Sequence, residues 1–146
     1  MLRNRLDKFL IVLYERAKRK QESLIWDDIL GKFKSIGSIL YLGADYRFLN
    51  PQNISIGTNF SAGAHFRLEA IDSYNGYNFY PNILIGNNVS FEDHCHVGCI
   101  NSIVFEDNVM IASKVIISDH FHGEINIEEL RIPPRSRKLY SKGPII

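Results

Sequence analysis

The sequence predicts an all-β solenoid of parallel strands, about three coils long, preceded by a helical segment. The first observation is a six-residue spacing of apolar residues that begins at Ile56. The second is a change of period, because apolar residues in the first 35 positions recur at steps of three and four. The length of 146 residues favours a single domain, which we expect to span residues 1–146 with the coils at 54–122.

The six-residue repeat runs through residues 56–73, 85–102 and 105–122. A β-residue advances about 3.3 Å, so six residues make a short strand and a tight corner, and three such units close one coil. All nine first positions are apolar, and seven of the nine fifth positions are apolar or cysteine. The first positions are Ile56, Ala62, Leu68, Ile85, Phe91, Val97, Phe105, Ile111 and Ile117; the fifth positions are Phe60, Phe66, Val89, Cys95, Val109, Val115 and Phe121. We expect both sets to point inward.

Small residues fill many second positions of the repeat. Gly57 and Gly86 are examples, and we expect them to leave space at the corner and to tolerate a positive φ. Cys95 is expected to be a small core residue rather than a nucleophile. His65 and His94 share the fourth position of successive coils and are expected to stack.

Two segments interrupt the repeat. Residues 74–84 are rich in Tyr and Asn, and they predict an extruded loop. Residues 123–143 hold two prolines and five basic residues but no hexapeptide, and they predict a second, longer loop. Residues 143–146 are typical of the approach to a further coil.

Residues 1–35 predict a helical cap over the open end of the solenoid. Their apolar face comprises Leu2, Leu6, Phe9, Leu10, Leu13 and Ala17. A second short helix is expected over 23–33, with Ser23 as its N-cap and Trp26, Ile29 and Leu30 as its apolar face. The alternative for the first helix is a peripheral membrane contact, because it is basic and amphipathic.

Charge and cysteine content exclude several classes of protein. Seventeen Lys and Arg balance sixteen Asp and Glu, so the chain has no basic field for nucleic acid. Two cysteines, Cys95 and Cys99, form neither a zinc motif nor a disulfide framework, and no metal is expected. The apolar run 9–14 is shorter than the roughly 20 residues of a membrane span. We therefore expect a cytoplasmic protein, with the inner face of the membrane as the alternative location.

Residues 111–123, Ile-Ala-Ser-Lys-Val-Ile-Ile-Ser-Asp-His-Phe-His-Gly, resemble the hexapeptide-repeat acetyltransferases of galactosides, maltose and nodulation factors. They look most similar to the O-acetyltransferases of lipopolysaccharide and O-antigen clusters. Those carry Ser-Asp-His-x-His-Gly, then Pro-Pro and Ser-Arg, then Ser-x-Gly-Pro. This chain matches them at Ser118–Gly123, Pro133-Pro134, Ser136-Arg137 and Ser141–Pro144.

The resemblance, which covers residues 54–146, implies a left-handed parallel β-helix, an acetyl-CoA donor and a sugar or polysaccharide acceptor. Flat walls with apolar edges favour a homotrimer. Similar enzymes continue with further hexapeptides, and the resemblance places much of the acetyl-CoA site there. We therefore expect this chain to be C-terminally truncated, and its cofactor-binding residues stay unassigned.

Acetyl transfer to a hydroxyl needs a base, and histidine, with a pKa of about 6.5, can remove a proton near neutral pH. Alignment with the galactoside and maltose enzymes implies that His122 is this base. His120 and Asp119 stand beside it and are expected to orient it or to bind acceptor. The same alignment places Glu92 where the galactoside enzyme has an acceptor-binding Asn, and Asp93 is a second candidate acceptor contact.

Two other functions stay open. One is a non-catalytic remnant of such an enzyme. The other is a trimeric zinc enzyme of the carbonic-anhydrase type, suggested by His94-x-His96 and His120-x-His122. That family pairs two ligands as His-x4-His, a spacing that this sequence lacks.

Overall fold

The computed structural model describes residues 2–146, and within the N-terminal helix it describes the side chains of residues 5, 7–17, 20, 29 and 30. The chain divides into two compact units, Met1–Lys32 and Phe33–Ile146. Each unit is described by itself below.

The first unit is one continuous helix, α1 (Leu2–Leu30), rather than the two helices that the sequence predicts. Good helix formers such as Leu, Arg, Lys, Glu and Gln dominate this segment, and nothing at Ser23 interrupts them. The expected cap side chain of Ser23 and the apolar contact of Trp26 lie outside the described side chains. In the described part of the chain, no helix combines the length and the apolar character that a bilayer span requires.

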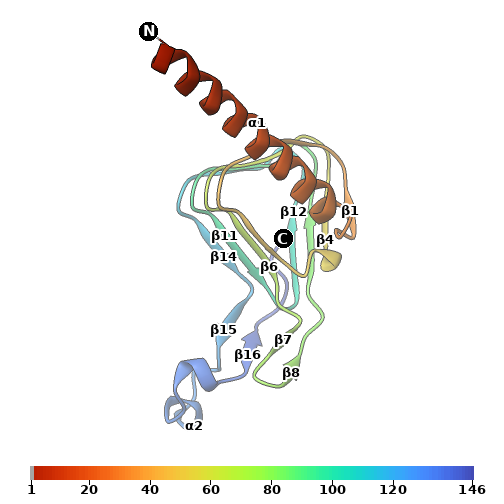
Figure 1. Cartoon of the computed structure of the whole chain (residues 1–146). Helices are drawn as coiled ribbons and strands as arrows, with labels where there is room; N and C mark the ends of the chain where they lie inside the picture. Colours follow the sequence, from red (N-terminus) through yellow and green to blue (C-terminus); the bar gives the residue numbers. More distant parts are fainter. Residues whose placement is uncertain (1) are drawn as a thin grey trace. The chain divides into compact units, whose positions relative to one another are not determined.

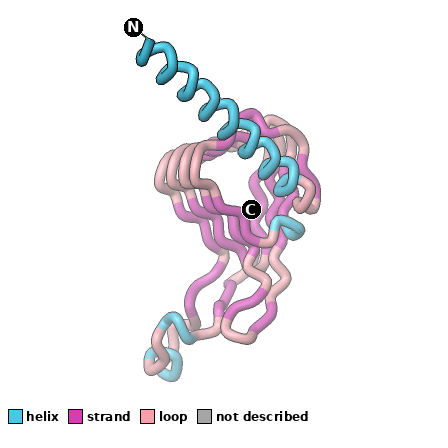
Figure 2. The backbone as a smooth tube through the Cα atoms, in the orientation of Figure 1, coloured by secondary structure: helices cyan, strands magenta, loops and turns pink. Residues whose placement is uncertain are grey.

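The second unit is a parallel β-helix with three walls, which confirms the fold class predicted from the sequence, a left-handed parallel β-helix. Its coils are stacked in register in Figures 1 and 2. Wall A consists of β1 (Ser35–Ile36), β4 (Ile54–Ile56), β9 (Asn82–Ile85) and β12 (Ser102–Phe105). Wall B consists of β2 (Ile39–Leu42), β5 (Phe60–Ala62), β10 (Ser90–Phe91) and β13 (Met110–Ile111). Wall C consists of β3 (Arg47–Leu49), β6 (Arg67–Ala70), β11 (His96–Cys99) and β14 (Ile116–Ser118).

The coils begin earlier than predicted. Residues 35–49 form a complete coil before Ile54, so each wall holds four strands instead of about three. Ile36, Leu42 and Phe48 pair in register with the next coil and are themselves six residues apart. The repeat is therefore present in this segment, and the short helix η1 (Pro51–Asn53) shifts its phase before Ile56.

The tight corners use the fourth position of the repeat, not the second, for left-handed backbone. Asn59, Asn88 and Asn108 have φ values of 59°, 56° and 64°. The expectation of a positive φ at the second-position glycines is wrong. Glycine is needed there because the backbones of successive coils pack too closely for a side chain. A Cβ on Gly57 would lie 2.6 Å from the carbonyl oxygen of Gly86, so these glycines are required by the close approach of successive coils.

First-position side chains fill the interior, as predicted, and aromatic rings pack between coils. Phe66 and Phe91 have ring centroids 4.9 Å apart, and Cys95 is buried in the core. At the corner, His65 and His94 stack at 4.5 Å, which confirms their predicted contact.

Two excursions leave the coil on the same side, as Figure 1 shows. The first is the hairpin of β7 (Ser73–Tyr74) and β8 (Tyr77–Asn78), and the wall resumes at Asn82, before the predicted end of the loop at 84. The second, here called the arm, holds β15 (His120–His122), α2 (Ile127–Leu130), η2 (Pro134–Ser136) and β16 (Leu139–Ser141).

The repeat stops at Ser118, four residues before the predicted end. From His120 the chain pairs antiparallel with β16 instead of continuing the coil. The predicted inward position of Phe121 is therefore wrong, and its side chain is 56% exposed on the arm. After the arm, Ile145 bridges in parallel to Ile103 of wall A, which agrees with the predicted approach to a further coil.

Candidate functional site

The hairpin and the arm, both predicted as loops, bind to each other. The Tyr74 hydroxyl donates to the Arg135 carbonyl oxygen at 2.7 Å, and the Asn75 amide donates to the same oxygen at 2.8 Å. The Tyr74 ring also meets the His122 ring edge to face, with centroids 5.4 Å apart. The predicted base therefore lies where the two excursions meet.

His122 lines an open cavity of about 430 Å³ in the arm, within the size range of small-molecule sites. Two cationic side chains, Arg137 and Lys142, and two aromatic ones, Phe121 and Tyr140, share the lining. The Lys142 ammonium lies over the Phe121 ring, 6.0 Å from its centroid. This cavity brings positive charge and aromatic surface beside the exposed residue His122.

Asp119 and His120 form a buried carboxylate–imidazole pair at the base of the arm. The Nδ1 atom of His120 lies 3.1 Å from the Asp119 carboxylate, and the two side chains are 11% and 0% exposed. A carboxylate only accepts, so Nδ1 carries a proton in this contact. This hydrogen bond therefore fixes the orientation of the imidazole.

The Asp119 carboxylate also holds the corner that follows β11. It accepts hydrogen bonds from the backbone N–H groups of Ile100 (2.9 Å) and Asn101 (2.8 Å), and from the Cys99 thiol (3.3 Å). Burial raises the pKa of Asp119, but the hydrogen bonds from His120 and these N–H groups outweigh it and hold the pKa below its usual value. Burial, together with the Asp119 charge, raises the pKa of Cys99 to about 12, so this thiol stays protonated.

A second carboxylate–imidazole pair, Glu69 with His96, lies on the outer face of wall C and was not predicted. The Glu69 carboxylate is 8% exposed, and it lies 2.9 Å from His96 Nε2, 2.9 Å from the Arg67 guanidinium and 3.2 Å from Arg47 Nε. Burial raises the pKa of Glu69, but the hydrogen bonds from Arg67 and His96 outweigh it and lower the pKa overall. The signal was available in the sequence, because Arg47, Arg67 and His96 all occupy sixth positions.

Gly98 separates the two pairs. A Cβ at this position would lie 3.2 Å from His120 Cε1 and 3.7 Å from His96 Nε2, so both imidazoles reach over the glycine. Among the residues that the structure describes, no three His, Cys, Asp or Glu side chains are grouped so as to hold a metal ion.

Replacing Gly98 by alanine is expected to displace the His120 ring by a few tenths of an ångström. The ring must yield because it is packed on the glycine, so its hydrogen bond to Asp119 lengthens. In imidazole ¹⁵N spectra, we expect the His120 Nδ1 signal to shift, and the free energy of unfolding to fall by about 1 kcal/mol or less. Ala112→Ser, a change at an exposed second position, is the control. An unchanged His120 signal in Gly98→Ala would contradict this packing.

Glu92 and Asp93 lie at the other end of β11 from the arm. The Asp93 carboxylate accepts a hydrogen bond from the Ala64 N–H at 2.7 Å and so braces a corner, as Asp107 does for Asn87. Glu92 is exposed. The structure does not bring this predicted acceptor pair together with His122 within one chain.

One comparison with known proteins gives a relative. The chain is 34% identical to the lipopolysaccharide biosynthesis O-acetyl transferase WbbJ of Escherichia coli (strain K12) over 101 residues, which cover 66% of this chain and 48% of that protein. The chain thus spans about half the length of this relative. Neither a protein-family model nor a solved structure matches the chain. The six-residue repeat and the coil of parallel strands are consistent with a hexapeptide-repeat acetyltransferase, and by this identity the chain is similar to a lipopolysaccharide O-acetyltransferase.

Proposed function

We propose that this chain transfers the acetyl group of acetyl-CoA to a sugar hydroxyl during the synthesis of bacterial surface polysaccharide. The observation that carries the proposal is the exposed His122 at the edge of the arm cavity, two residues from the fixed Asp119–His120 pair. The name of the relative, a lipopolysaccharide biosynthesis O-acetyl transferase, agrees with this chemistry.

In the proposed reaction, His122 acts as the general base. It removes the proton of the acceptor hydroxyl as that oxygen attacks the thioester carbonyl carbon, because an alcohol is a poor nucleophile while protonated. The tetrahedral intermediate collapses by breaking the carbon–sulfur bond, and the imidazolium returns its proton to the departing thiolate. The products are the acetylated sugar and CoA, and no acyl-enzyme forms.

Contacts within the arm support this role for His122. Arg137 donates from Nε to the Ile132 carbonyl oxygen at 2.8 Å and from its terminal nitrogen to the His122 carbonyl oxygen at 3.5 Å. The Tyr74 ring packs edge to face against the imidazole. We assign His120 and Asp119 to positioning, since they fix the start of β15.

We further propose a cytoplasmic homotrimer, with α1 available for contact with the membrane surface. The outer face of wall B exposes Leu40 (69%), Tyr41 (61%) and Met110 (71%), and wall C exposes Ile116 (72%). Closed threefold symmetry buries such apolar surface. Sedimentation of the purified chain as a monodisperse monomer would overturn this assembly.

The activity is tested by incubating the 146-residue chain with acetyl-CoA and sugars of bacterial surface polysaccharides. We expect release of the CoA thiol that depends on the acceptor, together with a mass increase of the sugar by one acetyl group. A non-catalytic remnant would bind sugar in calorimetry without releasing CoA. Acceptor-independent release alone would contradict the proposal.

A further inference from the structure

His122 lies at the point where the arm turns out of β15. The N–H of Gly123 donates to the Phe121 carbonyl oxygen at 3.1 Å, so His122 is the central residue of a three-residue turn. Gly123 follows with a φ of 88°, a positive value that favours glycine. The direction in which the imidazole leaves the backbone therefore depends on how this turn is held.

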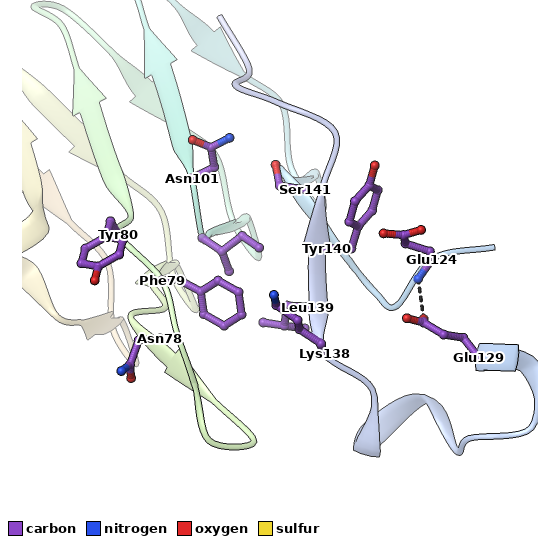
Figure 3. A pocket seen from close by; sticks show the side chains of 11 residues that line it. Asn78, Phe79, Tyr80, Asn101, Glu124, Glu129, Lys138, Leu139, Tyr140 and Ser141 are labelled. Carbon is purple, nitrogen blue, oxygen red and sulfur yellow. Dashed lines mark hydrogen bonds between the residues drawn. The ribbon is translucent and has the colours of Figure 1, made fainter. Parts of the chain in front are cut away.

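Glu129, a residue of the short helix α2, holds the chain directly after the turn. Its carboxylate accepts a hydrogen bond from the Glu124 N–H at 2.5 Å, as Figure 3 shows. Its own N–H donates to the Asn126 side chain at 2.8 Å, and this N-cap fixes the backbone from which the Glu129 side chain extends. Glu124 comes two residues after His122, so the carboxylate ties down the chain beside the proposed base.

Gly123 is buried, although the residues on both sides of it are exposed. A Cβ at this position would collide with Glu129 Oε2 and would lie 2.6 Å from Arg137 Cδ. The Arg137 guanidinium continues to the His122 carbonyl oxygen at 3.5 Å. Two side chains from separate parts of the arm thus close over the backbone of residues 122–124. An alanine at position 123 would have to push the Glu129 carboxylate out of its hydrogen bond.

We propose that Glu129 is a positioning residue for His122. This inference rests on the proposed function for the role of His122 as the base. The carboxylate holds the turn after β15 so that the imidazole stays against the Tyr74 ring, and Gly123 is required because only glycine leaves room for that carboxylate. The contact of the Tyr74 and His122 rings, whose centroids are 5.4 Å apart, reports whether the imidazole is in place.

The test replaces Glu129 in the whole chain and measures two quantities, the ring contact by the nuclear Overhauser effect and the turnover of acetyl transfer. In Glu129→Ala, we expect the effect between the Tyr74 and His122 rings to be lost. Turnover should fall about 10- to 100-fold because the base is misplaced, while the Michaelis constant for acetyl-CoA stays similar. Glu129→Gln should retain both quantities, because its side-chain oxygen still accepts from the Glu124 N–H. Glu128→Ala, which removes an exposed carboxylate from the same helical turn, is the control and should change neither.

Replacing Gly123 tests the same contact from the other side. Gly123→Ala should lose the ring contact as Glu129→Ala does, because its Cβ displaces the carboxylate. The variant with both changes should lose less turnover than the product of the two single losses, since both act on one contact. Turnover losses that multiply would show that Gly123 acts independently of Glu129 and would overturn its assigned role.

The ring contact and the turnover separate this inference from the proposed function. A ring contact that survives Glu129→Ala, full turnover after its loss, or a Glu129→Gln variant as poor as Glu129→Ala would overturn the assignment of Glu129. If the ring contact is lost in Glu129→Ala and kept in Glu129→Gln, but the wild-type chain transfers no acetyl group, the proposed function is contradicted. The placement of His122 by Glu129 then stands.

Discussion

Replacing His122 by alanine is expected to lower the turnover of acetyl transfer about 10²–10⁴-fold, the range for loss of a general base. The reason is that the acceptor hydroxyl then attacks while protonated, although the Asp119–His120 pair and the coil are unchanged. His122 lies on the exposed arm, so the free energy of unfolding should change little. The Michaelis constant for acetyl-CoA should also stay similar, because the base contacts the acceptor. Steady-state CoA release with a responsive sugar measures both constants.

Two further histidine variants serve as comparisons for the turnover of His122→Ala. His120→Ala should cost less turnover than His122→Ala, because a positioning residue acts only through the placement of β15. His65→Ala, at a stacked pair on the coil corner, should leave turnover unchanged. If His120→Ala abolishes transfer while His122→Ala keeps it, the base is His120, held ready by Asp119. If both variants stay active, the mechanism is wrong.

Asp119→Ala is expected to cause a large loss of stability, about 3 kcal/mol or more. The carboxylate is fully buried and accepts hydrogen bonds from Ile100, Asn101 and His120, so its removal leaves buried donors without their acceptor. Urea unfolding at neutral pH measures the loss. Asp107→Ala, which removes an exposed corner carboxylate, is the matched control and should cost less.

The pH dependence of the unfolding free energy shows how much of the stabilisation by Asp119 depends on its negative charge. Its pKa is lowered in the folded protein, so its stabilising contribution is fully present above the unfolded value of about 3.9 and is lost as pH falls through the lower, folded value. Asp119→Asn removes this titration. The stability difference between the wild-type chain and Asp119→Asn should therefore be constant from pH 7 to about pH 5 and shrink below about pH 4. A difference that grows on acidification would contradict the assigned shift.

The coil could be predicted from the sequence because the six-residue repeat is a local pattern. A fixed period of six residues places the same position of each coil on the same wall, and no knowledge of distant contacts is needed. The first coil escaped prediction because Pro51–Asn53 shifts the phase of the repeat by two residues between Phe48 and Ile56. Its glycines at positions 37 and 43 occupy the same second position as later ones and would have revealed it.

The environment of the candidate site could be predicted only in part. The histidine motif marks His120 and His122, but not the Tyr74 ring beside His122, since the hairpin and arm are long insertions with no period of their own. The Glu69–His96 contact crosses diagonally between β6 and β11, whose register pairs His96 with Arg67 and Gly98 with Glu69. The repeat fixes this register, but it does not say which outward side chains of neighbouring strands bond to one another.

The bond between hairpin and arm has a consequence for the order of folding and opening. Neighbouring coils pair residues 20 or 29 positions apart, so a coil can form as soon as its neighbour has formed. The Tyr74–Arg135 hydrogen bond joins residues 61 positions apart on exposed segments. Closing this long loop costs more conformational entropy, and the contact buries little surface that could offset this cost. The arm is therefore the last part to close during folding and the first to open afterwards, and a sugar chain can reach His122 while the coils stay intact.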